Sequence, residues 1–143
     1  MESGCVPSEA WALAPAAGIV VRSTTGIVVL DLDGDGHEQT GWDLFFLHIR
    51  TDGRATVGQR LNKDDPVGHP SCEGGDATGT HVHIARKYNG EWIAADGPLP
   101  FVLGGWTVHA GAAAYKGTMT QDGKTITADT NGSAETQITR PKP

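Results

Sequence analysis

Two dipeptides, Asn89-Gly90 and Asp122-Gly123, constrain the fold of this chain more than any other sequence feature. Both members of each pair tolerate a positive φ angle, which a two-residue turn between antiparallel strands requires. Each pair also stands between short runs of strand-forming residues, so each predicts a β-hairpin. The expected strand pairs are Thr80–Lys87 with Glu91–Ala94, and Ala113–Thr120 with Lys124–Ala128.

The rest of the chain has the same character. It contains 20 glycines and 8 prolines, a composition that favours many turns and disfavours long helices. Further strands are expected at Ile19–Arg22, Gly26–Leu32 and Trp42–Ile49, the last of them buried. A meander over Ala55–His69 should point Val57 and Val67 inward. We therefore predict an all-β domain of antiparallel β-sheets and hairpins.

Charge and hydropathy exclude several classes of protein. The formal net charge is -6, and the 11 Lys and Arg residues form no basic stripe, which argues against nucleic-acid binding. No apolar run approaches the roughly 18–20 residues that cross a bilayer, and the first residues do not resemble a signal peptide. Cys5 and Cys72 are either a disulfide of an exported protein or two unrelated thiols.

His81 and His83 are the most suggestive titratable pair. Side chains alternate along a strand, so the two imidazoles should point to one side, about 6.7 Å apart. Val82 and Ile84 would then pack on the opposite face. A His-x-His pair can equally lie on a solvated strand surface without function. A glycine-rich loop before the pair, and His48 at the end of the buried strand, favour a functional site.

An ordered set of motifs resembles a known family. The matching segments are Ala14-Pro15-Ala16-Ala17-Gly18-Ile19-Val20-Val21, Phe45-Phe46-Leu47-His48, Gly58-Gln59-Arg60-Leu61, Pro66-Val67-Gly68 and Thr78-Gly79-Thr80-His81-Val82-His83. Together they resemble the lysostaphin/LytM-type zinc metalloendopeptidases, which cut peptide cross-links of bacterial cell walls. Two further stretches are most similar to its LasA-like staphylolytic branch, namely Pro70-Ser71-Cys72-Glu73-Gly74-Gly75 and Tyr88-Asn89-Gly90-Glu91-Trp92.

The resemblance implies a role for each histidine. His83 matches a zinc ligand, His81 the catalytic histidine that acts on the metal-bound water, and His48 a second catalytic histidine. It also implies a LytM-like fold, the duplicated hybrid motif, over residues 14–130, with a lead-in segment at 1–13 and a polar tail at 131–143. Bacterial cell-wall peptides would be the partners, and the location would be extracellular or cell-wall-associated.

One part of the family pattern is missing. The family's first two zinc ligands, a His and an Asp, precede the Ala14-Pro15 strand, but Met1–Leu13 contain neither. The fold is therefore expected to be incomplete at its N-terminus. The chain is either a fragment or a degenerate member that binds cell-wall peptides without cutting them, or other residues replace the ligands. His37 and Asp43 have the right order for a replacement but follow the wrong strand.

A second metal site is suggested by the acidic loop. Asp31, Asp33 and Asp35, followed by Gly36, match the start of a calcium-binding loop. The twelfth position of that loop is Trp42 where glutamate is expected, and no helices flank it. The alternative is a hairpin tip kept soluble by its aspartates.

Single residues outside these motifs receive simpler interpretations. Trp92 could line a substrate groove or belong to the core, whereas Trp106 is expected in the core. Arg86 is expected to be a strand-surface charge. His69 and His109 are interpreted as exposed loop histidines, not ligands.

Overall fold

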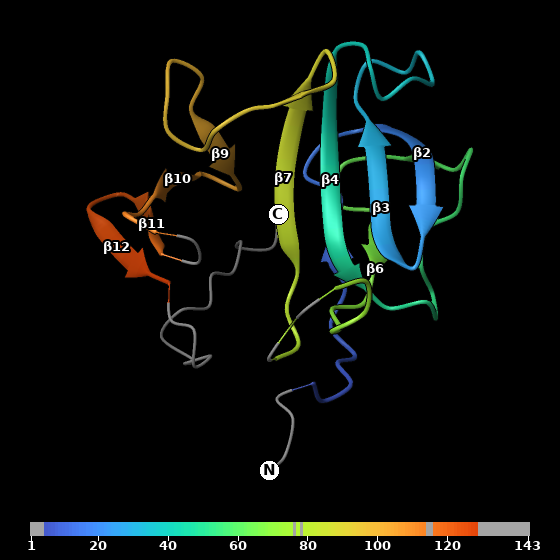
Figure 1. The fold of residues 1–143 in the computed structure, drawn as a ribbon, viewed down its shortest axis with the longest axis horizontal. Helices are drawn as coiled ribbons and strands as arrows, with labels where there is room; N and C mark the ends of the chain where they lie inside the picture. The colour runs from blue at the N-terminus through green and yellow to red at the C-terminus, as the bar shows by residue number, and fades with distance from the viewer. Residues whose placement is uncertain (1–4, 76, 78, 114–115, 129–143) are drawn as a thin grey trace. The chain divides into compact units, whose positions relative to one another are not determined.

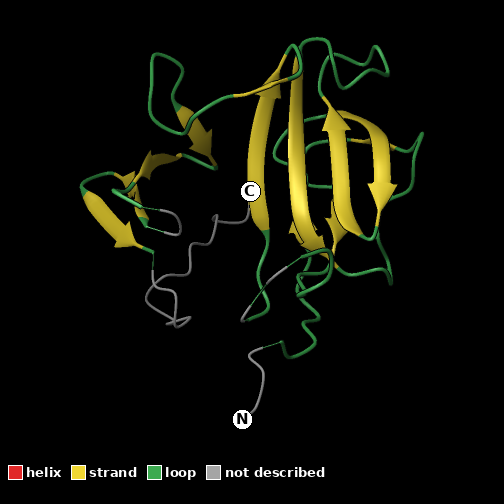
Figure 2. Cartoon of the chain, viewed as in Figure 1, coloured by secondary structure: helices red, strands yellow, loops and turns green. Residues whose placement is uncertain are grey.

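A computed structural model describes residues 5–75, 77, 79–113 and 116–128. These residues form strands joined by turns and loops, without a helix among them (Figure 2). The chain divides into two compact units, Met1–Ile93 and Ala94–Pro143. The predicted all-β class with antiparallel pairing is confirmed, because every strand pair in both units is antiparallel.

The first unit is built on a six-stranded sheet of order β5-β2-β3-β4-β7-β8, whose four central strands lie side by side in Figure 1. A two-stranded sheet pairs β1 with β6. The strands are β1 (Ala12–Leu13), β2 (Gly18–Thr24), β3 (Gly26–Asp31), β4 (Trp42–Ile49), β5 (Arg60–Leu61), β6 (Pro66–Gly68), β7 (His83–Tyr88) and β8 (Glu91–Trp92).

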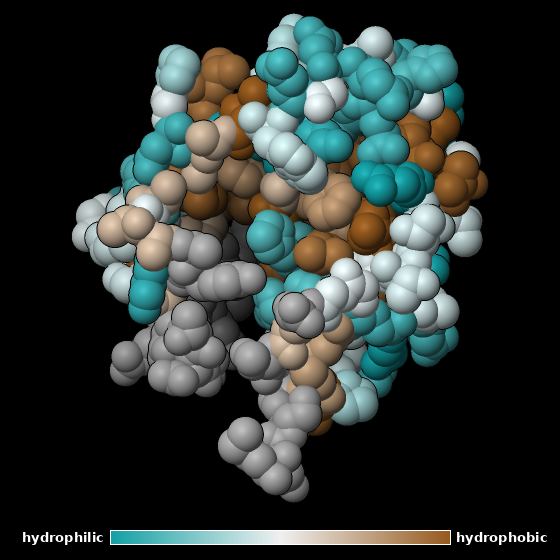
Figure 3. Space-filling view, in the orientation of Figure 1, coloured by the Kyte–Doolittle hydropathy of each residue, from teal (hydrophilic) through white to brown (hydrophobic). Residues whose placement is uncertain are grey.

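One face of the six-stranded sheet carries the core. Alternate residues of β3 and β4, including Leu30, Leu44 and Phe46, are buried in one apolar cluster with Val67 from β6. Asp31 directly follows Leu30 in β3, and Asp43 directly precedes Leu44 in β4. Because side chains alternate along a strand, both aspartates point away from the core, on the opposite face of the sheet. Figure 3 shows a hydrophilic surface at the end of the sheet where the loop between β3 and β4 lies.

Several predicted strands are confirmed and several details are corrected. β4 has the predicted bounds, and Asn89 and Gly90 turn with φ of 49° and 80°. The strand predicted from Thr80 begins only at His83. Val57 is 62% exposed, so its inward placement was wrong, whereas Val67 is buried.

Arg86 also differs from expectation. It is 7% exposed, because it lies on the core face of β7 opposite Leu44. Its guanidinium lies over the Trp42 ring, 5.6 Å from the centroid. A guanidinium stacked on an aromatic ring keeps a favourable electrostatic contact when it leaves water.

The second unit forms a four-stranded antiparallel sheet of order β12-β11-β10-β9. Its strands are β9 (Phe101–Leu103), β10 (Trp106–Ala110), β11 (Gly117–Gln121) and β12 (Lys124–Thr127). The Asp122-Gly123 hairpin is confirmed, with φ of 49° and 79°. β9 and β10 were not predicted, and Trp106 is buried as expected. Residues 131–143 of the predicted tail lie outside the described part of the chain.

Cys5 and Cys72 form a disulfide across 67 residues of sequence. This resolves the alternative left open by the sequence. The bond ties the start of the described chain to the loop that follows β6. Within the described residues, no helix is long and apolar enough to cross a membrane.

Candidate active site

A β-bulge places His48 among the other two histidines. Gly26 pairs with Ile49 and Ile27 pairs with Leu47, so His48 is an extra residue in β4. Its φ of 68° is left-handed. Phe46 and Ile49 are both in the core, so the bulge shifts the alternation by one residue. Bulges commonly re-aim a side chain beside a functional site, and here the shift turns His48 toward the face of Leu47.

That face also carries His83, because Leu47 and His83 are cross-strand partners. The His48 and His81 rings pack together with centroids 4.5 Å apart. Val82 and Ile84 pack against the core from the opposite side, as predicted. The structure thus brings together the three histidines that the sequence singled out.

Backbone carbonyls orient two of the imidazoles. His48 donates its Nδ1 hydrogen to the Glu73 carbonyl at 2.9 Å, and His81 donates its own to the Gly79 carbonyl at 2.7 Å. A carbonyl can only accept, so Nδ1 is the protonated nitrogen in each ring. The Nε2 lone pair is therefore the one available for a proton or a metal ion.

His83, at the start of β7, has a shifted pKa. Desolvation lowers the pKa of His83 below its usual value, and the charges of His48 and His81 lower it further. The side chain remains exposed at the surface of β7. A lowered pKa keeps this imidazole neutral near pH 7, the form that binds a metal.

The loop over Pro70–Gly75 holds the histidines in place. Ser71 donates its backbone N–H and its hydroxyl to the His48 carbonyl, at 2.8 and 2.9 Å. The backbone N–H of His81 donates in turn to the Ser71 carbonyl at 3.4 Å. The Glu73 carboxylate accepts bonds from the backbone N–H and hydroxyl of Thr51. One loop therefore positions both His48 and His81.

Two glycines explain how this loop can lie so close to the sheet. A Cβ on Gly26 would stand 2.5 Å from both the Glu73 carbonyl oxygen and the Gly74 Cα. A Cβ on Gly74 would stand 2.8 Å from the Gly26 Cα. The glycine-rich loop before the histidine pair therefore approaches the chain's own β2–β3 turn closely.

A cavity of about 350 Å³ adjoins this loop. Its lining includes Arg50, Ser71 and Thr80, together with the Cys5–Cys72 disulfide and the Val6-Pro7 segment. Ser71 bonds the backbones of both His48 and His81, but no histidine is among the described residues that line the cavity.

The described residues fit only part of a zinc site. A catalytic zinc takes three protein ligands and keeps one position open. The ring nitrogens of the three histidines do not all lie within 4.8 Å of one another, so they do not form a site for one ion. Carboxylate oxygens of Asp31, Asp33 and Asp35 do lie that close together. His37 and Asp43 belong to no described group of three donor side chains within reach of one ion. We therefore assign no zinc-dependent step to these residues.

Trp92 and His69, two further residues singled out from the sequence, differ in exposure. Trp92 is 57% exposed, meets Phe45 edge-on with ring centroids 5.2 Å apart, and lies under the Lys87 ammonium. His69 is buried, against expectation, because its ring stacks on Trp11.

His109 is not a loop residue, since it lies half-buried in β10. It bonds Asp96 and Thr120 through its two ring nitrogens. Both of those partners belong to the second unit. The expectation that His109 is not a metal ligand stays untested.

Comparisons with known proteins bear on the fold. No family model matches the chain, and no curated protein sequence matches it. Among solved structures, the chain is similar to pseudoalterin, described as a novel M23 metalloprotease from the deep sea. The TM-score is 0.65 at 18% identity, over 83% of this chain and 70% of that one. At this identity the similarity is one of fold, and the chain therefore has the LytM-like, all-β fold of an M23 metalloprotease.

Proposed function

We propose that this chain carries a LytM-type zinc-endopeptidase site for glycine-containing peptides of bacterial peptidoglycan, and that the site in this chain has little or no hydrolytic activity. The observation that carries the proposal is the meeting of His48, His81 and His83 on one face of an M23-like sheet. A peptide would occupy the cavity lined by Arg50, Ser71 and Thr80, which Ser71 connects to the backbones of His48 and His81.

Each histidine has a role that its surroundings support. His48 and His81 present Nε2 lone pairs because their Nδ1 hydrogens are bonded to carbonyls. Such nitrogens can take a proton from a nucleophilic water and return it to a leaving amine. His83, kept neutral by its lowered pKa, is the ligand that would bind zinc.

The second candidate function is a peptide-binding module without hydrolysis. It is favoured by one specific observation: among the described residues, no group of three donor side chains that includes a histidine comes within the reach of one ion, whereas a catalytic zinc takes three protein ligands. A peptide could still occupy the cavity beside Ser71 and Thr80. An extracellular location agrees with the Cys5–Cys72 disulfide, since such bonds persist in oxidising compartments.

Metal analysis and a peptide assay test both functions. Zinc bound after dialysis is measured for the wild type, His83→Ala and the control His37→Ala, whose imidazole is exposed in the distant β3–β4 loop. We expect His83→Ala to lose any bound zinc and His37→Ala to retain it. Unchanged zinc in His83→Ala would contradict the ligand assignment.

Pentaglycine is then offered to the same proteins, with binding measured by calorimetry and cleavage by chromatography. We expect binding with little or no hydrolysis. Robust zinc-dependent cleavage would contradict the proposed weak activity and support a complete enzyme. Neither binding nor cleavage would exclude both candidate functions.

A further inference from the structure

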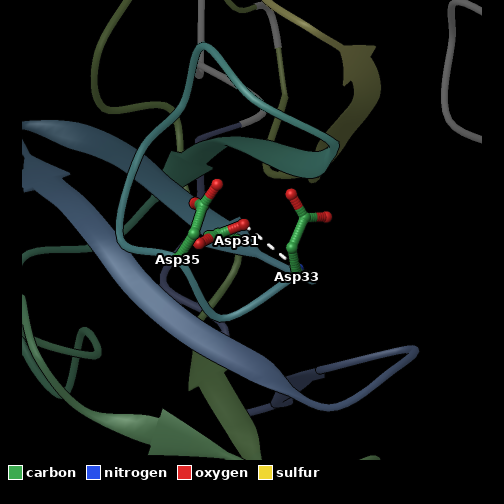
Figure 4. Close-up of side chains that lie close together, drawn as sticks. All are labelled: Asp31, Asp33 and Asp35. Atoms are coloured by element: carbon green, nitrogen blue, oxygen red, sulfur yellow. Dashed lines mark hydrogen bonds between the residues drawn. The ribbon is translucent and has the colours of Figure 1, made fainter.

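A cluster of carboxylates lies at the other end of β4 from His48. Asp31 ends β3, and Asp33 and Asp35 follow in the loop that leads to β4 (Figure 4). One carboxylate oxygen from each of the three lies within 4.8 Å of the others. The loop wraps around Asp31, whose two oxygens accept the backbone N–H groups of Asp33 and Gly36 at 3.1 and 2.8 Å.

A fourth carboxylate, that of Asp43, faces this cluster from β4. Asp43 is the cross-strand partner of Asp31, and opposed residues of antiparallel strands point to the same side of a sheet. Their neighbours Leu30 and Leu44 point into the core. The Asp31 and Asp43 side chains therefore both leave the outer face, where the β3–β4 loop covers them.

Asp43 has no partner that would explain its burial. It is 0% exposed, and neither of its carboxylate oxygens has a hydrogen-bond partner. An isolated buried carboxylate is costly unless it is paired, protonated or bound to a metal. This observation is independent of the loop motif, and it points to a ligand that the protein itself does not supply.

Neither basic side chain next to the cluster supplies the missing positive charge. Arg22 is paired with Glu38 at 2.9 Å. Lys87 lies opposite Asp43 across β4 and β7, but its ammonium is held over the Trp92 ring, 4.4 Å from the centroid. Among the described residues, no ion pair with Lys, Arg or His forms at Asp31, Asp33, Asp35 or Asp43.

We propose that Asp31, Asp33, Asp35 and Asp43 bind one calcium ion. Calcium prefers six to eight oxygen ligands and tolerates irregular geometry, which a loop with alternating carboxylates can provide. In a calcium loop of this type the twelfth residue supplies a bidentate carboxylate. In this chain the twelfth position is Trp42, which has no carboxylate. Asp43, the next residue along β4, would supply the carboxylate in its place. The ion would fix the β3–β4 loop on the sheet.

The site is tested on the full chain with calcium alone. The metal-free protein is prepared with a chelator, and calcium binding is measured by calorimetry and by the shift in Tm. We expect a shift of about 5 °C at calcium roughly twenty times its Kd. Asp43→Asn and Asp33→Asn should each weaken calcium binding about tenfold or more, because each removes one ligand charge.

The control is Asp122→Asn, which removes one carboxylate at the β11–β12 turn, where asparagine tolerates the left-handed φ of 49°. It should bind calcium like the wild type. Asp33 is exposed, and in Asp33→Asn the new side-chain amide keeps an oxygen that can accept the Trp42 N–H. Asp33→Asn therefore reports on calcium binding even if Asp43→Asn folds poorly. Absence of a calcium-dependent shift in the wild type, or an unchanged Kd in Asp43→Asn, would overturn the proposal.

Discussion

The two ends of β4 form a natural comparison. Near its end, His48 has its Nδ1 hydrogen bonded to a carbonyl and its own carbonyl bonded to Ser71. At its start, Asp43 is equally buried, but both of its oxygens lack a partner. One strand therefore carries one polar side chain that the protein satisfies and one that it does not.

The difference teaches what each end depends on. The histidine end is organised by the chain itself, through the Pro70–Gly75 loop, the Cys5–Cys72 disulfide and the contact between Gly26 and Gly74. The acidic end has no counterion among the described residues, and by our proposal it depends on a calcium ion from solution. Perturbing the chain's own supports should therefore damage the first end, whereas removing metal should damage the second.

Reducing the disulfide should have the largest effect. Closing a loop of 67 residues restricts the unfolded chain, and its loss is expected to cost about 4 kcal/mol of unfolding free energy. Urea unfolding with and without reductant measures this cost. The described residues contain no free cysteine, so reductant acts there on one bond. Calcium affinity should survive reduction in the folded protein, and a parallel loss of it would contradict the independence of the two ends.

Gly26→Ala should be next in size. The new Cβ would stand 2.5 Å from the backbone of Glu73 and Gly74, at a φ of 75°. We expect a cost of about 3 kcal/mol, from strain and from displacement of the loop. Gly58→Ala is the matched control, since its φ is 90° but nothing lies within 4 Å. It should cost about 1 kcal/mol. Equal costs in urea unfolding would show that the contact with the loop is unimportant.

The sequence predicted most of the first unit because its signals are local. Asn89-Gly90 fixes a turn by backbone preference alone, and Trp42–Ile49 is long and apolar enough to identify a buried strand. β9 and β10 were not predicted because they are short and lie in or next to a stretch rich in proline and glycine. They are stabilised by pairing with each other and with β11, which a local sequence pattern does not reveal.

The sites were predictable in outline and not in detail. The His-x-His spacing identified His81 and His83. Simple alternation would place His48 on the core face, and only the bulge opposite Gly26 and Ile27 moves it. Asp43 was missed as a partner of Asp31 because their proximity comes from strand register across a ten-residue loop. An aspartate inside an otherwise apolar strand was the available signal.

The unfolding free energy of the calcium-free protein should depend on pH through Asp43. Burial raises the pKa of Asp43 to about 7, and the charges of Asp31, Asp33, Glu38 and Asp35 add to the effect. The folded state then holds a proton that the unfolded state, with a pKa near 3.9, has released. This contribution is fully present below about pH 4 and is lost as the pH rises through 7.

Asp43→Asn removes this dependence. Between pH 5 and 7, with a chelator present, the wild type should lose about 2 kcal/mol more unfolding free energy than the variant. Lys87, the basic residue opposite Asp43, does not cancel the effect because its ammonium lies over Trp92. Saturating calcium should abolish the difference in slope. Identical pH profiles without calcium would show that Asp43 is already satisfied.

The smallest expected effect concerns His83, and it tests the other end of β4. Desolvation is the main cause of the lowered pKa of His83, followed by the charges of His48 and His81. His48→Ala should therefore raise the pKa of His83 only part of the way to its usual value, and His81→Ala should raise it less. Titration of the His83 ring protons by NMR measures both shifts. His37→Ala, in the β3–β4 loop, should leave the titration unchanged. A larger shift in His37→Ala than in His48→Ala would mean that the acidic end governs His83, and the two ends would not be independent.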